Sequence, residues 1–150
     1  MPNLPVANHE PFFLDSVYFI ALFSPQDNWR DAAQAATDET PLHQPMVTSE
    51  GVFLETMAHF SQRTRAERQD VGQRMASLRA DPGYTIVPHD ARLSEAALDL
   101  YVGEFADSTF SLQDCAAIVI MRVYGITSIL TADQEFARAG FTPLLRRYLD

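Results

Sequence analysis

The sequence predicts a single α/β domain with a short, mostly parallel β-sheet. Short apolar segments typical of strands alternate along the chain with longer segments of helical periodicity. This order is typical of parallel sheets whose strands are joined by helices. A length of 150 residues with 47% hydrophobic content suffices for one domain with a sizeable core. We find no internal repeat and no linker, so we expect one domain over residues 1–150, with its core at roughly 11–148.

The first quarter of the chain is predicted to form one strand and two helices. Residues 11–15 form a short apolar strand ending in an acid, and the apolar segment 16–23 forms a helix. A second helix is expected to begin at Ser24, because serine suits the N-cap, the next residue is proline, and an acid occupies the third helical position. This helix ends near Glu39, and prolines mark 40–45 as a loop.

The middle of the chain repeats the alternation of strand and helix. A strand at 46–48 leads into a helix capped by threonine or serine, which we expect to continue through 61–80 to a Pro-Gly stop. A third strand follows at 85–88. Residues 90–105 then place apolar side chains at helical spacing. At the end of the chain, 142–148 is compatible with an edge strand.

A helix–strand–helix unit within residues 107–141 organises the second half. Ser111 followed by Asp114 matches a capping box, with aspartate in place of the usual glutamate. The body of the helix, 115–121, is apolar on every face, which predicts that it is buried all round. Gly125 is placed to end the helix in a left-handed turn, and a short strand follows it.

Four acids stand at the ends of predicted strands or near the beginnings of predicted helices. Asp15 ends the first strand and Asp133 follows the strand at 126–130, while Asp114 begins a helix and Glu55 lies a turn or two into another. Ionised carboxylates are rarely found close to a core without partners. Because ligands gather at the carboxyl ends of parallel strands, we expect these acids to converge at one edge of the sheet.

These segments, in this order, resemble the PIN-domain family, in particular its toxin-type ribonucleases of the VapC kind. The resemblance covers roughly residues 11–148, and all four acidic positions of the family pattern are filled. It implies a three-layer α/β/α fold with a short, mostly parallel central sheet, and a metal-dependent endoribonuclease. The segments that carry the resemblance are 13–16, 48–55, 111–115 and 130–136.

The resemblance also implies a cofactor, partners and roles for residues. Mg²⁺ or Mn²⁺ would be the cofactor, since both prefer oxygen ligands and can activate a water for displacement at phosphorus. RNA would be the substrate, and a homodimer and a small antitoxin, with a segment in a groove beside the active site, would be expected. The catalytic and metal-binding residues would be Asp15, Glu55, Asp114 and Asp133, oriented by Ser16, Asp107 and Thr131.

Charge and composition limit the possible functions. The net charge is −9 and all eleven basic residues are arginine, so the chain lacks the general basic footprint of nucleic-acid-binding proteins. Bound cations would neutralise clustered acids. Five arginines within 61–80 could hold RNA phosphates, although the sequence does not indicate which of them face the cleft. A single cysteine, the absence of a signal-peptide pattern and the absence of a bilayer-length apolar run predict a cytoplasmic protein without membrane association.

Other interpretations remain open at this point. The chain could be a PIN-type RNA-processing nuclease without an antitoxin, or a catalytically inert module with the same fold. Each acid, taken singly, could be a helix cap, a turn residue or a solvent-facing side chain. His59 shares a helix face with Glu55 but lacks the further nitrogen or sulfur ligands that zinc requires, and Cys115 is expected to be a core residue.

Overall fold

A parallel five-stranded sheet forms the centre of the computed structural model, which describes residues 1–5, 9–41 and 43–148. All four strand pairings within it are parallel, so the predicted sheet is confirmed. The strand order is β3-β2-β1-β4-β5. The strands are β1 (Phe12–Leu14), β2 (Met46–Ser49), β3 (Tyr84–Val87), β4 (Ser128–Leu130) and β5 (Thr142–Pro143).

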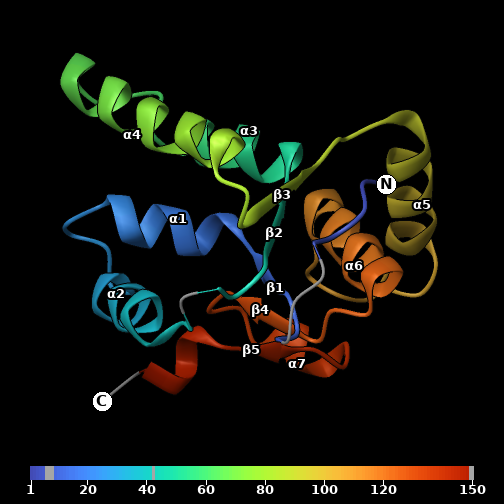
Figure 1. The fold of residues 1–150 in the computed structure, drawn as a ribbon. Coiled ribbons are helices and arrows are strands. Elements are labelled where there is room, and N and C mark those ends of the chain that lie inside the picture. The colour runs from blue at the N-terminus through green and yellow to red at the C-terminus, as the bar shows by residue number, and fades with distance from the viewer. Residues whose placement is uncertain (6–8, 42, 149–150) are drawn as a thin grey trace.

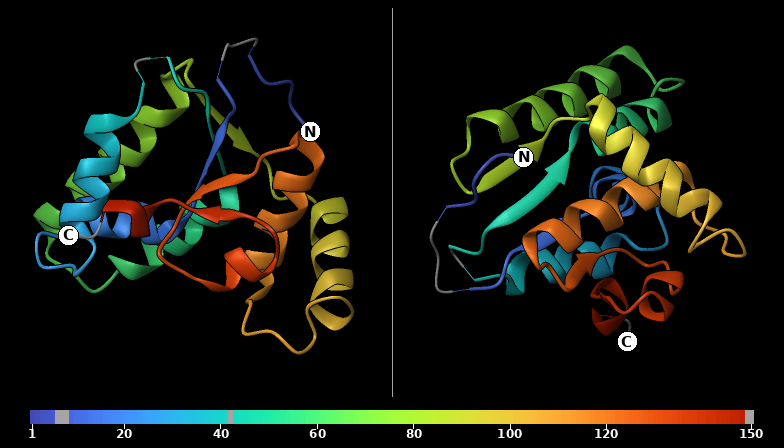
Figure 2. Two further views of the ribbon diagram at one scale, coloured as in Figure 1. Left: turned by 90° about the horizontal axis from the view of Figure 1, so that it is seen from below. Right: turned by 90° about the vertical axis from the view of Figure 1, so that its right-hand side faces the viewer.

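Helices cover both faces of this sheet and give the predicted three-layer α/β/α architecture. Figure 1 shows α1 and α2 on one side of the strands and α5 and α6 on the other, while α4 extends outward beside α3; Figure 2 shows the same layers from two further directions. None of the helices in the described part of the chain is long and apolar enough to cross a bilayer. The helices are α1 (Ser16–Phe23), α2 (Arg30–Glu39), α3 (Glu50–His59), α4 (Arg65–Ser77), α5 (Ala91–Val102), α6 (Leu112–Tyr124) and α7 (Glu135–Arg138), with 3₁₀ turns η1 (Leu78–Ala80) and η2 (Leu145–Tyr148).

The central strand β1 is the point at which the strand order reverses. Phe12 is in register with Met46 of β2 on one side and with Ser128 of β4 on the other. The hydroxyl of Thr48, which is fully buried, donates to the carbonyl of Leu14 at 2.9 Å and ties β2 to the end of β1. In open parallel sheets such a reversal leaves a crevice at the carboxyl ends of the strands, where ligands bind. The residue after Leu14 therefore lies at the position where this topology favours a site.

Helix α6 is built as its sequence predicts. Ser111 and Asp114 form a reciprocal capping box, and Gly125 ends the helix with φ +67°, in the left-handed region that glycine adopts without a steric penalty. Six of its side chains are buried, and Val119 is half-buried. The apolar segment 115–121 is therefore covered as predicted, while Leu112, Arg122 and Val123 at the two ends of α6 are exposed.

The predicted start of the second helix at Ser24 is wrong. Ser24 instead ends α1, because its backbone N–H donates to the carbonyl of Ile20. The carboxylate of Asp27 accepts from the backbone N–H of Trp29 at 2.8 Å, and the chain turns before α2 begins at Arg30. A serine and an acid that suit a helix start are used here for the end of one helix and for a turn.

The predicted continuous helix through 61–80 is also wrong. Helix α3 ends at His59, and α4 begins at Arg65 after a turn. The Thr64 hydroxyl accepts from the backbone N–H of Glu67 at 3.2 Å and caps the new helix. The spacing of Thr64 and Glu67 is that of a capping box, so the sequence contained a signal for this break. The break creates a corner between α3 and α4.

Candidate functional site

Asp15 lies at the carboxyl end of β1 and caps the N-terminus of α1. Its side chain is only 5% exposed. One carboxylate oxygen accepts from the backbone N–H of Ser16 at 2.9 Å, and the other accepts from the hydroxyl of Thr131 at 2.8 Å. Both oxygens are therefore oriented by hydrogen bonds, one from the first residue of α1 and one from the residue that follows β4.

Glu55 approaches Asp15 from α3. The hydroxyl of Ser16 donates to Oε1 of Glu55, while the backbone of the same serine donates to Asp15. Ser16 is 2% exposed, so one buried residue connects two of the four acids. Glu55 itself is exposed, which matches the interpretation of a solvent-facing helix residue. Its carboxylate nevertheless accepts a hydrogen bond from the first residue of α1.

The other two acids, Asp114 and Asp133, stand in the first turn of α6 and shortly after β4. Asp114 accepts from the backbone N–H of Ser111 at 2.9 Å, which completes the capping box of α6. Asp133 accepts from the backbone N–H of Glu135 at 3.0 Å, and its own backbone N–H donates to the hydroxyl of Thr131 at 3.3 Å. The helix-cap and turn roles considered from the sequence are therefore real, and they fix the orientation of these two carboxylates.

The acids influence one another electrostatically. Burial, followed by the neighbouring charges of Asp114 and Glu55, raises the pKa of Asp15 to about 7, against the opposing effect of the hydrogen bond from Thr131. Burial also raises the pKa of Asp114, with smaller contributions from Glu55 and Asp133, while hydrogen bonds with Ser111 oppose the rise. Electrostatic effects therefore join Asp15 with Asp114 and Glu55, and Asp114 with Glu55 and Asp133. That all four carboxylates serve one site stays a prediction.

The donor chemistry of this set fits a hard divalent cation. Every donor is a carboxylate oxygen, the ligand type that Mg²⁺ and Mn²⁺ prefer. The ion pairs found among the described residues involve other acids and reach none of these four. Across residues 1–5, 9–41 and 43–148, however, no three acidic, histidine or cysteine side chains are close enough to enclose an ion. An ion bound here would therefore have few protein ligands and would keep several waters in its coordination shell, as Mg²⁺ commonly does.

Of the residues expected to orient the ligands, two contact the acids and one lies apart. Ser16 and Thr131 each hydrogen-bond a carboxylate of the group. Asp107 is exposed in the turn after α5, and no hydrogen bond or ion pair within the described ranges joins it to the four acids. Although Asp107 occupies a position that is often acidic in the family, it does not orient the four acids through such a contact in this structure.

Gln113 is a further neighbour of the site, and no pattern in the sequence indicated it. Its amide donates to the hydroxyl of Ser49 at 3.4 Å, which links the N-terminus of α6 to that of α3. A Cβ on Gly51 would lie 1.9 Å from the Gln113 side chain, so glycine permits this approach. Gly51 and Gln113 are 62 positions apart in the chain, so no local sequence pattern predicts that they are close in space.

Comparison with known proteins agrees with this fold. The model of the PIN domain matches residues 12–142. The chain belongs to the PIN-domain family. A search of curated proteins gave no match. Among solved structures, this PIN domain resembles Mycobacterium tuberculosis VapC20, described as a sarcin-ricin loop cleaving toxin, with a TM-score of 0.75 and 23% sequence identity over 87% of this chain and 96% of VapC20.

In the part of this PIN domain that the structure describes, no histidine or cysteine joins the acids in an arrangement that could hold a metal ion. His59 is exposed one helical turn beyond Glu55, and its ring packs edge-on against Phe60, with 5.0 Å between ring centroids. Cys115 is buried in the core, and burial raises the pKa of its thiol. The core role expected for Cys115 is thus confirmed.

Proposed function

We propose that this protein is an endoribonuclease that depends on Mg²⁺ or Mn²⁺ and cleaves RNA phosphodiester bonds by hydrolysis. The observation that supports this most is the group of four carboxylates at the reversal of strand order. Burial, together with the neighbouring charges of Asp114 and Glu55, raises the pKa of Asp15 to about 7. The ion pairs found among the described residues leave the four acids without a protein cation. A divalent cation would relieve the repulsion between these charges. Membership of the PIN family supports the same chemistry.

In this proposal the ligands are Asp15, Glu55, Asp114 and Asp133, acting directly or through waters. A bound ion supplies an activated water and stabilises the leaving oxygen in an in-line displacement at phosphorus. Thr131 and the Ser16 backbone hold both oxygens of Asp15, and the Ser16 hydroxyl holds Glu55. Because protons and cations compete for the same carboxylates, metal affinity is expected to fall at low pH.

We further propose that the protein is the toxin of a toxin–antitoxin pair, a cytoplasmic homodimer restrained by a small antitoxin and not associated with a membrane. The fold shared with VapC20 and the motifs of the toxin-type branch support this assignment. A short neighbouring reading frame that encodes a DNA-binding fold with a flexible tail would favour the toxin. Its absence would favour a PIN-type nuclease of RNA processing.

The proposal is tested by incubating purified protein with RNA in Mn²⁺, in Mg²⁺ and in excess chelator. We expect cleavage with either metal and none in chelator. Equal cleavage in chelator would contradict the metal mechanism. The absence of cleavage in every condition would favour the inert module, an alternative to which the net charge of −9 lends weight because it opposes the approach of RNA.

A further inference from the structure

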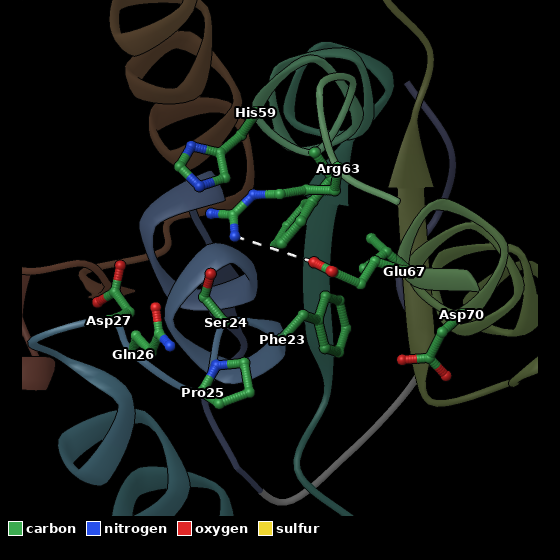
Figure 3. A pocket seen from close by; sticks show the side chains of 11 residues that line it. Phe23, Ser24, Pro25, Gln26, Asp27, His59, Arg63, Glu67 and Asp70 are labelled. Atoms are coloured by element: carbon green, nitrogen blue, oxygen red, sulfur yellow. Dashed lines mark ion pairs between the residues drawn. The ribbon is translucent and has the colours of Figure 1, made fainter. Parts of the chain in front are cut away.

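A cavity of about 570 Å³ opens where the end of α1 faces the corner between α3 and α4. Figure 3 shows His59 and Arg63 on one side of it, with Ser24, Gln26 and Asp27 across from them. The cavity exists because α1 ends at Ser24 and α3 ends before the cap of α4. It is separate from the four acids, none of which lines it.

Two helices, α1 and α3, lead from the acidic group to the cavity. Helices α1 and α3 pack against each other. Ser16, at the start of α1, hydrogen-bonds Glu55 in the middle of α3, and Phe23 and His59 at the ends of the two helices line the cavity. His59 follows Glu55 by four residues, or about 6 Å along a helix. Stacked nucleotides rise about 3.4 Å each, so an RNA strand at the acids could reach the cavity within about two or three nucleotides.

The charges that line the cavity are mainly negative, with one arginine and three carboxylates. Arg63 lies 3.9 Å from Glu67, and Asp70 pairs with Arg74 at 3.1 Å. Asp27 adds a further carboxylate, so there is no excess of positive charge to hold a phosphate. These charges suit an uncharged group that presents hydrogen-bond donors.

The shapes of the lining side chains suit a flat group. His59 is an exposed ring, and the guanidinium of Arg63 lies over the ring of Phe60 at 5.8 Å from its centroid. Unstacked RNA bases bind proteins by stacking on aromatic rings or guanidinium planes while their edges hydrogen-bond to side chains. Opposite these planes, Gln26 and Asp27 offer oxygen acceptors for such an edge.

We infer that this cavity binds one base of the RNA strand near the scissile phosphate, and that it selects a base with an exocyclic amino group. The base stacks against His59 and the Arg63 guanidinium. Its amino group donates to the carboxylate of Asp27, as cytosine N4 donates to Asp or Glu in other complexes. This inference rests on the proposed function, and it assigns a specificity site to residues outside the acidic group.

The test is an NMR titration of the ¹⁵N-labelled, metal-free protein with cytidine and with uridine. These nucleosides are uncharged and similar in shape, so the acidic surface does not repel them and only the base edge differs. We expect cytidine to shift the amide signals of residues 24–27 and 59–63 at lower concentration than uridine. The His59→Ala variant should weaken cytidine binding about fivefold or more, as expected for loss of one stacking partner. His43→Ala, also an exposed histidine, is the matched control.

A second variant tests the reading of the base edge. Asp27→Asn keeps an oxygen that can accept from the Trp29 N–H, but it adds amide donors. It should therefore reduce or reverse the preference for cytidine.

The inference would be overturned by any of three results. These are no amide shifts in residues 24–27 and 59–63, an equal response to both nucleosides, or cytidine binding that His59→Ala leaves unchanged. The titration measures binding and does not depend on cleavage. If the protein bound cytidine as predicted but cleaved no RNA in the separate nuclease assay, the proposed function would be refuted and the base-binding site would stand.

Discussion

Replacing Asp15 by asparagine is expected to abolish metal-dependent RNA cleavage while the fold is retained. Asp15 is the most buried of the four acids, and both of its oxygens are already oriented by Ser16 and Thr131. The amide keeps the size and part of the hydrogen bonding but removes the negative charge that a cation requires. Since a metal stabilises charge in the transition state by several kcal/mol, we expect a loss of about a thousandfold or more in rate.

The control for this variant is Asp99→Asn, which changes an exposed acid on α5 by the same chemistry. Cleavage rates are measured on one RNA at saturating Mn²⁺, and the fold is checked by circular dichroism. Asp99→Asn should cleave like the wild type. If Asp15→Asn also retained wild-type cleavage, the carboxylate at the end of β1 would not belong to the catalytic group.

The second large effect is on stability in the absence of metal. The pKa of Asp15 is about 7 in the folded chain and about 3.8 when unperturbed. Between these values the folded chain binds more protons at this site than the unfolded chain, so the free energy of unfolding falls as pH rises from about 4 to about 7. At about 1.4 kcal/mol per pKa unit, the loss attributable to Asp15 amounts to a few kcal/mol.

Asp15→Asn removes this titration and should flatten the decline. Denaturant unfolding in chelator at intervals between pH 4 and pH 8 measures the effect for the wild type and for the Asp15→Asn and Asp99→Asn variants. The wild type and Asp99→Asn should lose stability in parallel, while Asp15→Asn loses less and becomes the most stable of the three at pH 8. Parallel curves for all three proteins would show that Asp15 is not held protonated by its surroundings.

Local patterns in the sequence were sufficient to predict most of the fold. Alternating strand and helix segments predicted the parallel sheet, and the Ser111–Asp114 spacing predicted a capping box that the structure contains. The two errors, at Ser24 and across 61–80, concern helix ends. There the same residue types can start a helix, end one or form a turn, and tertiary packing decides among them. The Thr64 cap shows that the second error was avoidable.

The candidate site was predictable in part for a topological reason. Parallel strands bring their carboxyl ends to one edge, so Asp15 and Asp133 were expected to be neighbours, and the structure links them through Thr131. The bridge from Ser16 to Glu55 depends on how α1 packs on α3, which no sequence pattern specifies. The cavity beside His59 depends on the corner after α3, so it could not be foreseen while that corner was expected to be helical.

The central claim is that four carboxylates dispersed over the chain together hold a divalent cation. Anomalous diffraction from a crystal soaked in Mn²⁺ at pH 8 tests it most directly, because manganese scatters anomalously and is located independently of any assumed ligand. We predict a peak within bonding distance of at least two of these carboxylates, with waters completing the coordination. A crystal that shows no peak among Asp15, Glu55, Asp114 and Asp133, or shows manganese only elsewhere on the surface, would contradict the claim.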